Sequence, residues 1–409
     1  MPSISRRQFI SRVAQGTAFL SLGAGLPLPL RHGQAFADEA GKVGGKTLVL
    51  LELAGGNDGL NTIVPFRDEL YYKHRPVLGI PAKSVLKLDD RFGLNPVLEP
   101  LAPFWNAGEM AVVHGVGYPN PSLSHFRSLE IWHTARPDIG EGVEGYGWLG
   151  RAVDRMAGEL PGAFVGAGEL PLAMRSPSAR VAAVESPASY GPAGVSDRET
   201  NAMRRLSEPP AASSGNAALD YLRRSAGQAY IAADQLARMA RDYKAKADYP
   251  DTGIGQAFKA TAQILAAGLG TRAVYLTLGG FDTHAGQQVA QPQLLGWVAG
   301  GLSAFLKDVA LQGKANDVVV MVYSEFGRRV KENESYGTDH GSAGPVLLFG
   351  KGVKGGFVGE PPRLDALEDG NLVHSTDFRR LYATLLERWL GVPAHPILGR
   401  GYEALPVLA

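Results

Sequence analysis

The run Ala273-Val-Tyr-Leu-Thr-Leu278, followed by Gly279-Gly-Phe-Asp-Thr-His284, decides the fold class. The apolar run predicts a buried strand, and the glycine pair ends it. The loop then carries a carboxylate, Asp282, and an imidazole, His284, two residues apart. Because side chains alternate along an extended chain, this spacing places both on the same face.

Polar residues border three further apolar runs in the same way. Thr47–Leu53 leads into a glycine pair and Asp58, residues 317–323 lead into Ser324 and Glu325, and Asp339-His340 precedes the run 345–349. In an α/β sheet, the residues just past the strand ends converge on one crevice. The sequence therefore predicts a metal-centred site formed by Asp58, Asp282, His284, Glu325, Asp339 and His340.

Strand-like and helix-like segments alternate along the rest of the chain, which predicts an α/β fold with a largely parallel sheet. A further strand is expected at 109–114. Helices are expected at 95–106, 120–134, 217–246, 255–267, 294–311 and 377–390. Residues 38–409 are predicted to form one domain, with a helical elaboration at about 155–265.

Composition excludes several classes of protein. The 409 residues carry a formal net charge of +1, which gives no indication of nucleic-acid binding. The chain has no cysteine, so disulfides, thiolate metal ligands and a cysteine nucleophile are excluded. The absence of thiols suits an oxidising compartment.

The N-terminus predicts export. Ser5-Arg-Arg-Gln-Phe-Ile10 matches the twin-arginine consensus, and Ala35-Phe-Ala37 offers a cleavage site before Asp38. Residues 1–37 are therefore expected to be a signal peptide, and the mature protein to be periplasmic or secreted. The apolar segment between the two motifs is too interrupted for stable membrane insertion. The alternative is a chance arginine pair in a disordered tail.

Each candidate ligand also has an ordinary structural explanation. Carboxylate and imidazole donors suit zinc, manganese or iron, but Asp282 could instead bond its own loop backbone and leave His284 exposed. Glu325 could pair with Arg328 or Arg329. His340 could be a loop histidine held by its neighbour.

Ser124 lies at a predicted helix start, where backbone amides favour an anion, and His125 and Arg127 are adjacent. The alternative is a simple N-cap. No Gly-x-Ser-x-Gly elbow is present, which argues against an ordinary serine esterase. The glycine pair before Asp58 lacks both the dinucleotide fingerprint and the P-loop lysine.

The order and spacing of these residues resemble the alkaline phosphatase and sulfatase superfamily. The chain most resembles a bacterial family of twin-arginine-exported proteins within it that carries only a "domain of unknown function" label. The resemblance spans nearly the whole mature chain and implies a three-layer αβα fold with a helical insertion. It rests on Gly55-Gly-Asn-Asp-Gly-Leu60, Ser124-His-Phe126, Gly147-Trp-Leu-Gly150, Gly279-Gly-Phe-Asp-Thr-His284, Ser324-Glu-Phe-Gly-Arg328, Asp339-His-Gly341 and Thr376-Asp-Phe-Arg379.

The resemblance also implies roles for single residues. Asp58 is similar to the acidic ligand after the first strand, and Ser124 to the nucleophile. Asp282, His284 and His340 resemble the ligands of one metal.

Ser324-Glu-Phe326 aligns with a Ser-Asp-His pattern that serves a second metal, but Phe326 cannot bind an ion. Either His125 or Asp339 would have to substitute for the missing ligand. The departure leaves open a one-metal enzyme, a rearranged pair of metals, or a protein that has lost the chemistry.

The expected function is an exported hydrolase of small phosphate or sulfate esters that uses one or two divalent ions. Zinc is the first choice, with manganese, magnesium or calcium as alternatives. Arg127, Arg328 or both would hold the oxyanion. The alternative is a non-catalytic exported protein that keeps the fold for binding or assembly, in a complex with another exported protein.

Overall fold

A computed structural model describes residues 45–140, 142, 145–158, 160–176, 181–185, 201, 205 and 242–409. The predicted signal peptide and nearly all of the predicted helix 217–246 lie outside these residues. The description below concerns this part of the chain.

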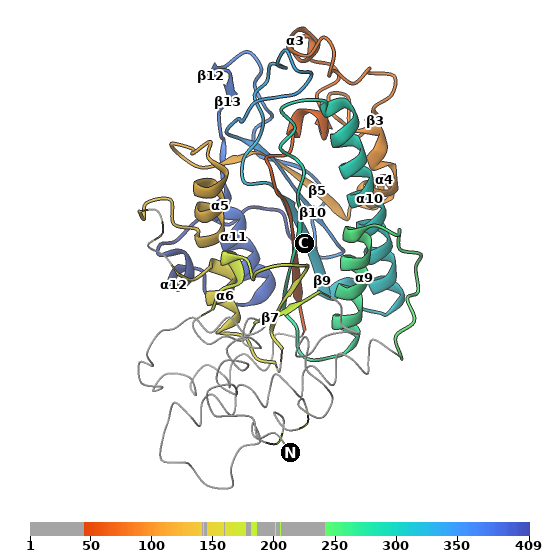
Figure 1. Cartoon of the computed structure of the whole chain (residues 1–409), viewed down its shortest axis with the longest axis vertical. Coiled ribbons are helices and arrows are strands. Elements are labelled where there is room, and N and C mark those ends of the chain that lie inside the picture. The colour runs from red at the N-terminus through yellow and green to blue at the C-terminus, as the bar shows by residue number, and fades with distance from the viewer. Residues whose placement is uncertain are drawn as a thin grey trace, which may run out of the picture.

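A nine-stranded sheet forms the centre of the molecule (Figure 1). Its neighbouring strands are parallel, except where β10 runs antiparallel between β5 and β9. The prediction of an α/β fold with a largely parallel sheet is therefore confirmed. In spatial order the strands are β11 (Gly356–Val358), β5 (Met110–Gly117), β10 (Gly344–Phe349), β9 (Val318–Tyr323), β1 (Thr47–Leu53), β8 (Ala273–Leu278), β6 (Gly162–Val165) and β7 (Val181–Val184), with β14 (Thr376–Asp377) also beside β5.

Helices cover both faces of the sheet, which accounts for the continuous apolar runs of its strands. All seven residues of β1 are buried. Leu48 and Leu50 pack into one core, whereas Val49 and Leu51 pack into the other. The first core is covered by α5 (His125–Thr134), α6 (Trp148–Val153), α11 (Phe378–Thr384) and α12 (His395–Leu398), and the second by α4 (Ala102–Asn106), α9 (Gly253–Ala266) and α10 (Gln287–Leu311).

Smaller elements gather at one end of the sheet, at the top of Figure 1, around a third and smaller apolar cluster. They are η1 (Gly59–Asn61), β2 (Ile63–Val64), α3 (Glu69–His74), β3 (Leu86–Lys87), β4 (Gly93–Leu94), β12 (Leu367–Glu368) and β13 (Asn371–Leu372). The remaining helical turns are η2 (Pro96–Leu101), η3 (Leu172–Met174), η5 (Ala315–Asp317) and the π-helical turn η6 (Leu385–Leu390).

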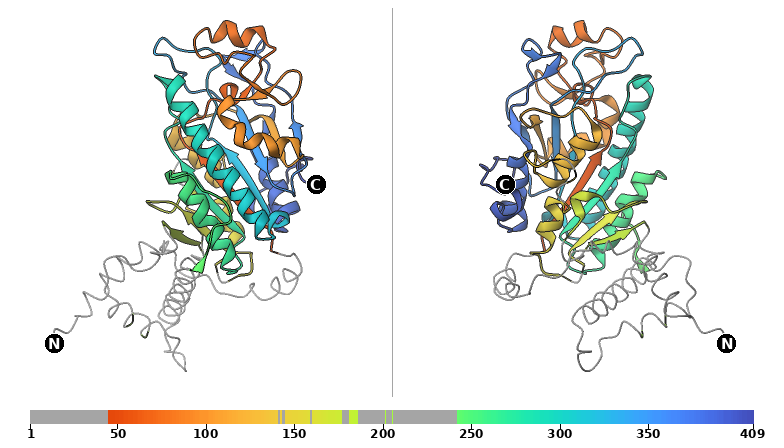
Figure 2. Two further views of the ribbon diagram at one scale, coloured as in Figure 1. Left: turned by 90° about the vertical axis from the view of Figure 1, so that its right-hand side faces the viewer. Right: turned by 60° about the vertical axis from the view of Figure 1, so that its left-hand side comes forward.

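Two expectations from the sequence need correction. Part of the expected helical elaboration is not helical, because β6 and β7 extend the central sheet with parallel strands. The helix expected from residue 294 begins seven residues earlier, at Gln287, and includes Pro292. This helix, α10, is the only one among the described residues long and apolar enough to cross a membrane, but it is mostly buried beside the sheet (Figure 2).

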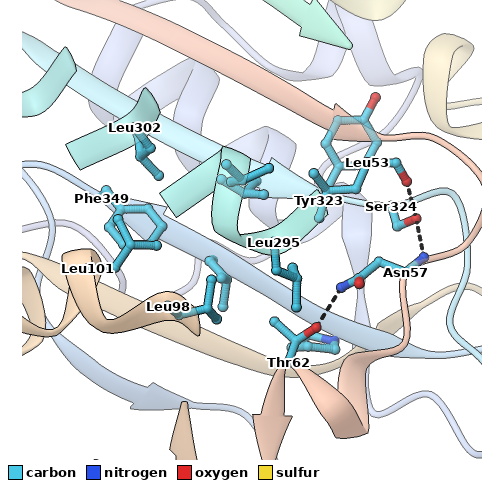
Figure 3. Close-up of a pocket in the computed structure, with 14 residues that line it drawn as sticks. Leu53, Asn57, Thr62, Leu98, Leu101, Leu295, Leu302, Tyr323, Ser324 and Phe349 are labelled. Atoms are coloured by element: carbon cyan, nitrogen blue, oxygen red, sulfur yellow. Dashed lines mark hydrogen bonds between the residues drawn. The ribbon is translucent and has the colours of Figure 1, made fainter. Parts of the chain in front are cut away.

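The turn after β1 is fixed where it meets β9. Ser324 Oγ donates to the carbonyl of Leu53 at 2.5 Å and accepts from the Asn57 amide at 2.9 Å, beside a cavity of about 20 Å³ under α10 (Figure 3). Gly55 has a φ of +117°, and a side chain there would collide with the backbone of Asp282. Glycine is therefore required where the β1 turn touches the β8 loop.

Candidate metal centre

The candidate ligands meet at one edge of the sheet. The loops after β1, β8 and β9 leave this edge from strand carboxyl ends. Because β10 is antiparallel, the residues that precede it, including Asp339 and His340, arrive at the same edge. Topology therefore explains why two candidate residues that precede a strand join candidate residues that follow strands.

The Asp282 carboxylate lies at the centre of the cluster. Its Oδ1 is 3.1 Å from Nε2 of His284 and 3.1 Å from Nε2 of His340, and its Oδ2 is 3.4 Å from Nε2 of His125. Partial burial raises the pKa of Asp282, but the Arg328 guanidinium, which donates to its Oδ1 at 2.7 Å, has the larger effect, and the pKa is lowered to about 2. The carboxylate is therefore ionised at neutral pH.

Each of the three imidazoles is oriented through its other nitrogen. Nδ1 of His340 donates to the Leu123 carbonyl at 2.8 Å. Nδ1 of His125 lies 2.7 Å from Glu325, and Nδ1 of His284 lies 3.2 Å from Asp339. An acceptor at Nδ1 selects the tautomer whose Nε2 carries a free lone pair, as is usual for metal-binding histidines.

With this tautomer the Nε2 atoms of His284 and His340 face each other as lone pairs, 2.9 Å apart. Among the described residues, Nε2 of His125 is buried without a hydrogen-bond partner. Donor atoms of His125, Asp282 and His340 all lie within 4.8 Å of one another. Converging lone pairs repel unless a cation lies between them, so this arrangement fits a metal ion.

The donor set also discriminates between metals. Three imidazole nitrogens and one carboxylate oxygen suit zinc or another transition metal. Calcium and magnesium prefer sites built from oxygen ligands. The structure thus brings together Asp282, His284 and His340, as the sequence predicts, and adds His125.

Asp58 lies elsewhere, in a buried ion pair. Its Oδ1 accepts from Arg75 Nη2 at 2.9 Å, and its Oδ2 accepts from Arg75 Nη1 and, at 2.5 Å, from Gln287. The side chains of Arg75 and Asp58 are 0% and 1% exposed. The carboxylate expected to bind a metal is instead neutralised by a guanidinium.

Glu325 contacts the β1 turn and His125, and it forms no hydrogen bond or ion pair with the other candidate ligands. Its carboxylate accepts from the amides of Gly55 and Gly56 at 2.9 and 3.1 Å. Together with His125, these donors occupy both oxygens of a fully buried side chain. Glu325 is therefore placed as an orienting residue for His125, and Asp339 has the same position relative to His284.

Glu325→Gln is expected to weaken metal binding by about 10- to 100-fold, because the outer carboxylate fixes the orientation and basicity of the histidine. Competition with a chromophoric zinc chelator would measure the affinity. Glu130→Gln, on the same helix as His125 but paired with Arg127, is the matched control. Equal affinity of the Glu325→Gln variant and the wild type would contradict the orienting role.

The two arginines expected to hold an oxyanion are committed to other partners. Arg328 is buried and donates to the carbonyls of Gly55, Gly56, Phe281 and Thr338 as well as to Asp282. Arg127 binds Glu130 and the carbonyls of Pro137 and Ile139. Arg328 ties the loops together, and neither guanidinium is available in this geometry.

Ser124 and Phe326 complete the surroundings. Ser124 is the exposed N-cap of α5, but its side chain makes no capping hydrogen bond. The Phe326 ring is buried, with its centroid 4.8 Å from those of both His125 and His340. A buried apolar ring therefore lies beside His125 and His340, and it belongs to the residue that the superfamily resemblance aligns with a metal-binding histidine.

Several groups that support the site cannot be identified from the sequence. Arg75 and Gln287 hold Asp58, the Leu123 carbonyl orients His340, and Asn333 donates to Asp339 at 3.1 Å. No local motif marks these residues, because each acts across a contact between distant segments.

Comparisons with known proteins identify a family but no activity. The model of a family described as "Protein of unknown function (DUF1501)" matches residues 45–397. A comparison with curated proteins finds no match.

Several solved structures are similar at low identity. An alkaline phosphatase superfamily protein from Vibrio parahaemolyticus is 11% identical, with 87% of this chain and 69% of that one covered and a TM-score of 0.41. The lipoteichoic acid synthase LtaP from Listeria monocytogenes is 10% identical, with coverages of 84% and 81% and a TM-score of 0.37. The PsFucS1 sulfatase from Pseudoalteromonas sp. is 13% identical, with coverages of 93% and 77% and a TM-score of 0.38.

Proposed function

This chain belongs to the DUF1501 family of proteins of unknown function, and we propose that it is an exported, metal-dependent hydrolase of phosphate or sulfate esters. The observation that carries the proposal is the convergence of three imidazole Nε2 atoms on the Asp282 carboxylate. His125, Asp282, His284 and His340 would hold one divalent ion, with zinc as the first choice.

The same geometry favours a single ion. Asp58 is neutralised by Arg75, Glu325 is saturated by amides and His125, and Phe326 offers no donor. These are the residues from which a second metal site would have to be built. A second ion would first have to displace Arg75 from Asp58, or break the hydrogen bonds from the Gly55 and Gly56 amides to Glu325.

A bound divalent ion supplies Lewis acidity, which polarises an ester oxygen and lowers the pKa of a neighbouring hydroxyl. The chain contributes the position of that hydroxyl. Ser124 directly precedes His125, and it is exposed at the N-terminus of α5, where free amides favour an anion. We assign Ser124 as the nucleophile in this proposal.

Ser124→Ala is expected to abolish turnover of an aryl phosphate or aryl sulfate, with metal content unchanged. Because Ser124 makes no side-chain cap, the variant should lose less stability than the roughly 1 kcal/mol typical of a lost N-cap. Ser84→Ala, at an exposed serine whose side chain makes no hydrogen bond to the described residues, is the control. Assays with zinc, manganese, magnesium and calcium would test the reaction, and full activity of Ser124→Ala would exclude this nucleophile.

A second candidate function is a non-catalytic exported protein that uses the centre for binding or assembly, with another exported protein as partner. The observation that favours it is the commitment of Arg127 and Arg328 to backbone carbonyls, which leaves neither to hold an ester oxyanion. Wild-type protein that contains its metal but turns over neither ester class would make this the better assignment.

Export through the twin-arginine pathway is part of the proposal and rests on Arg6, Arg7 and the motif Ala35-Phe-Ala37. The mature protein is expected to begin near Asp38. An Arg6→Lys, Arg7→Lys variant should accumulate in the cytoplasm with its first 37 residues attached. Fractionation and N-terminal sequencing would show this, and continued export of the variant would contradict the pathway.

A further inference from the structure

A cavity of about 310 Å³ lies beside the residues that follow α5. It is bounded by the β5–α5 loop at Asn120, by Arg136 just after α5, and by the end of α12 and the residues that follow it, among them Arg400 and Tyr402. These segments lie on one side of the sheet (Figure 1). None of His125, Asp282, His284 and His340 is among the residues that line this cavity.

Three arginines, Arg136, Arg379 and Arg400, line this cavity. Arg379 is 3% exposed and is paired with Asp377 at 2.6 Å. The second carboxylate at the cavity is the exposed Asp138, so the three guanidiniums outnumber the acids. This local excess of positive charge favours binding of an anion in the cavity.

Two of the guanidiniums, those of Arg136 and Arg400, have N–H groups without an acceptor among the described residues. Among the described residues, no hydrogen bond or ion pair reaches the guanidinium of Arg136, and its Nε is buried without a partner. That group lies against Gly399, where an added side chain would meet it at 2.6 Å. Toward the part of the chain that the structure describes, the Arg400 guanidinium donates only through Nε, to Tyr402 at 2.8 Å.

Tyr402 fixes the spacing of the other two cations. The guanidiniums of Arg379 and Arg400 lie 5.0 and 5.1 Å from the centre of its ring. Cation–π contacts of this kind hold guanidiniums in place without neutralising them. The planar guanidiniums of Arg136 and Arg400 have N–H groups that no described residue accepts. Such groups suit bidentate binding of an oxyanion.

We propose that this cavity is a second anion site, which binds a phosphate or sulfate group independently of the metal centre. Its volume accommodates the oxyanion together with part of the molecule that carries it. The group can come from free inorganic anion or from an anionic polymer, since both present the same tetrahedral oxyanion.

Calorimetric titration of the full chain with inorganic phosphate, inorganic sulfate and dextran sulfate tests this site. Arg136→Gln and Arg400→Gln are each expected to weaken binding about tenfold or more, as for the loss of a charge-assisted hydrogen bond. Arg363→Gln removes an equal charge from an exposed pair with Asp365 and should leave binding unchanged. Since Arg400 is exposed, its variant carries the test if Arg136→Gln does not fold.

The His340→Ala variant separates this site from the metal centre, because anion binding at the arginines should survive it. Arginine-dependent binding of phosphate or sulfate would support free anion as the ligand, and such binding of dextran sulfate alone would support a polymer. Absence of binding by all three probes, or binding that is lost in His340→Ala and insensitive to the arginines, would overturn the proposal.

Discussion

The wild-type protein is expected to bind one divalent metal ion per chain, and both Asp282→Asn and His340→Ala are expected to lower metal affinity by more than about 100-fold. Loss of an orienting group alone typically costs 10- to 100-fold, and removal of a direct ligand should cost more. His340 Nε2 lies 2.9 Å from His284 Nε2 and 3.1 Å from Asp282, so its removal opens the centre of the cluster. Elemental analysis and chelator competition would measure stoichiometry and affinity.

Asp365→Asn is the matched control for the charge change, since Asp365 forms an exposed pair with Arg363. Its metal content should equal that of the wild type. Two ions per chain would contradict the assignment of Asp58 to a structural ion pair. If Asp282→Asn or His340→Ala bound metal as tightly as the wild type, the residue that was changed would not be a metal ligand.

Much of the fold can be predicted from the sequence because the central strands are buried on both faces. Their residues form continuous apolar runs, and β1 and β8 have the bounds that those runs indicate. By contrast, β6 and β7 are four-residue segments, Gly-Ala-Phe-Val and Val-Ala-Ala-Val, in which half of the residues are small. Segments this short and small carry little periodic signal, so their place in the sheet depends on tertiary contacts.

The candidate site is predictable to a similar degree. Asp282, His284 and His340 stand out because polar residues beside buried strands are unusual. The roles of Asp58 and Glu325 could not be separated from those of the ligands, since an acid after a strand looks the same whether it meets a metal or a guanidinium. Arg75 follows Asp58 by 17 residues, and only the packing of α3 against the sheet end brings the two together.

Arg75→Met is expected to destabilise the protein by about 3–5 kcal/mol, the cost typical of leaving one partner of a buried ion pair uncompensated. Asp58 would retain only Gln287 and the amide of Leu60 as donors, in a site where its side chain is 1% exposed. Urea denaturation in the presence of a chelator would measure the change without a contribution from metal binding.

The double variant Arg75→Met, Asp58→Asn tests the cause of that loss. If the cost comes from an unpaired buried charge, neutralising Asp58 should recover a large part of it, and the two changes should be strongly non-additive. Arg363→Met, which breaks an exposed pair, should cost less than about 1 kcal/mol. A similarly small cost for Arg75→Met would contradict the assignment of Arg75 as the group that compensates the buried charge of Asp58.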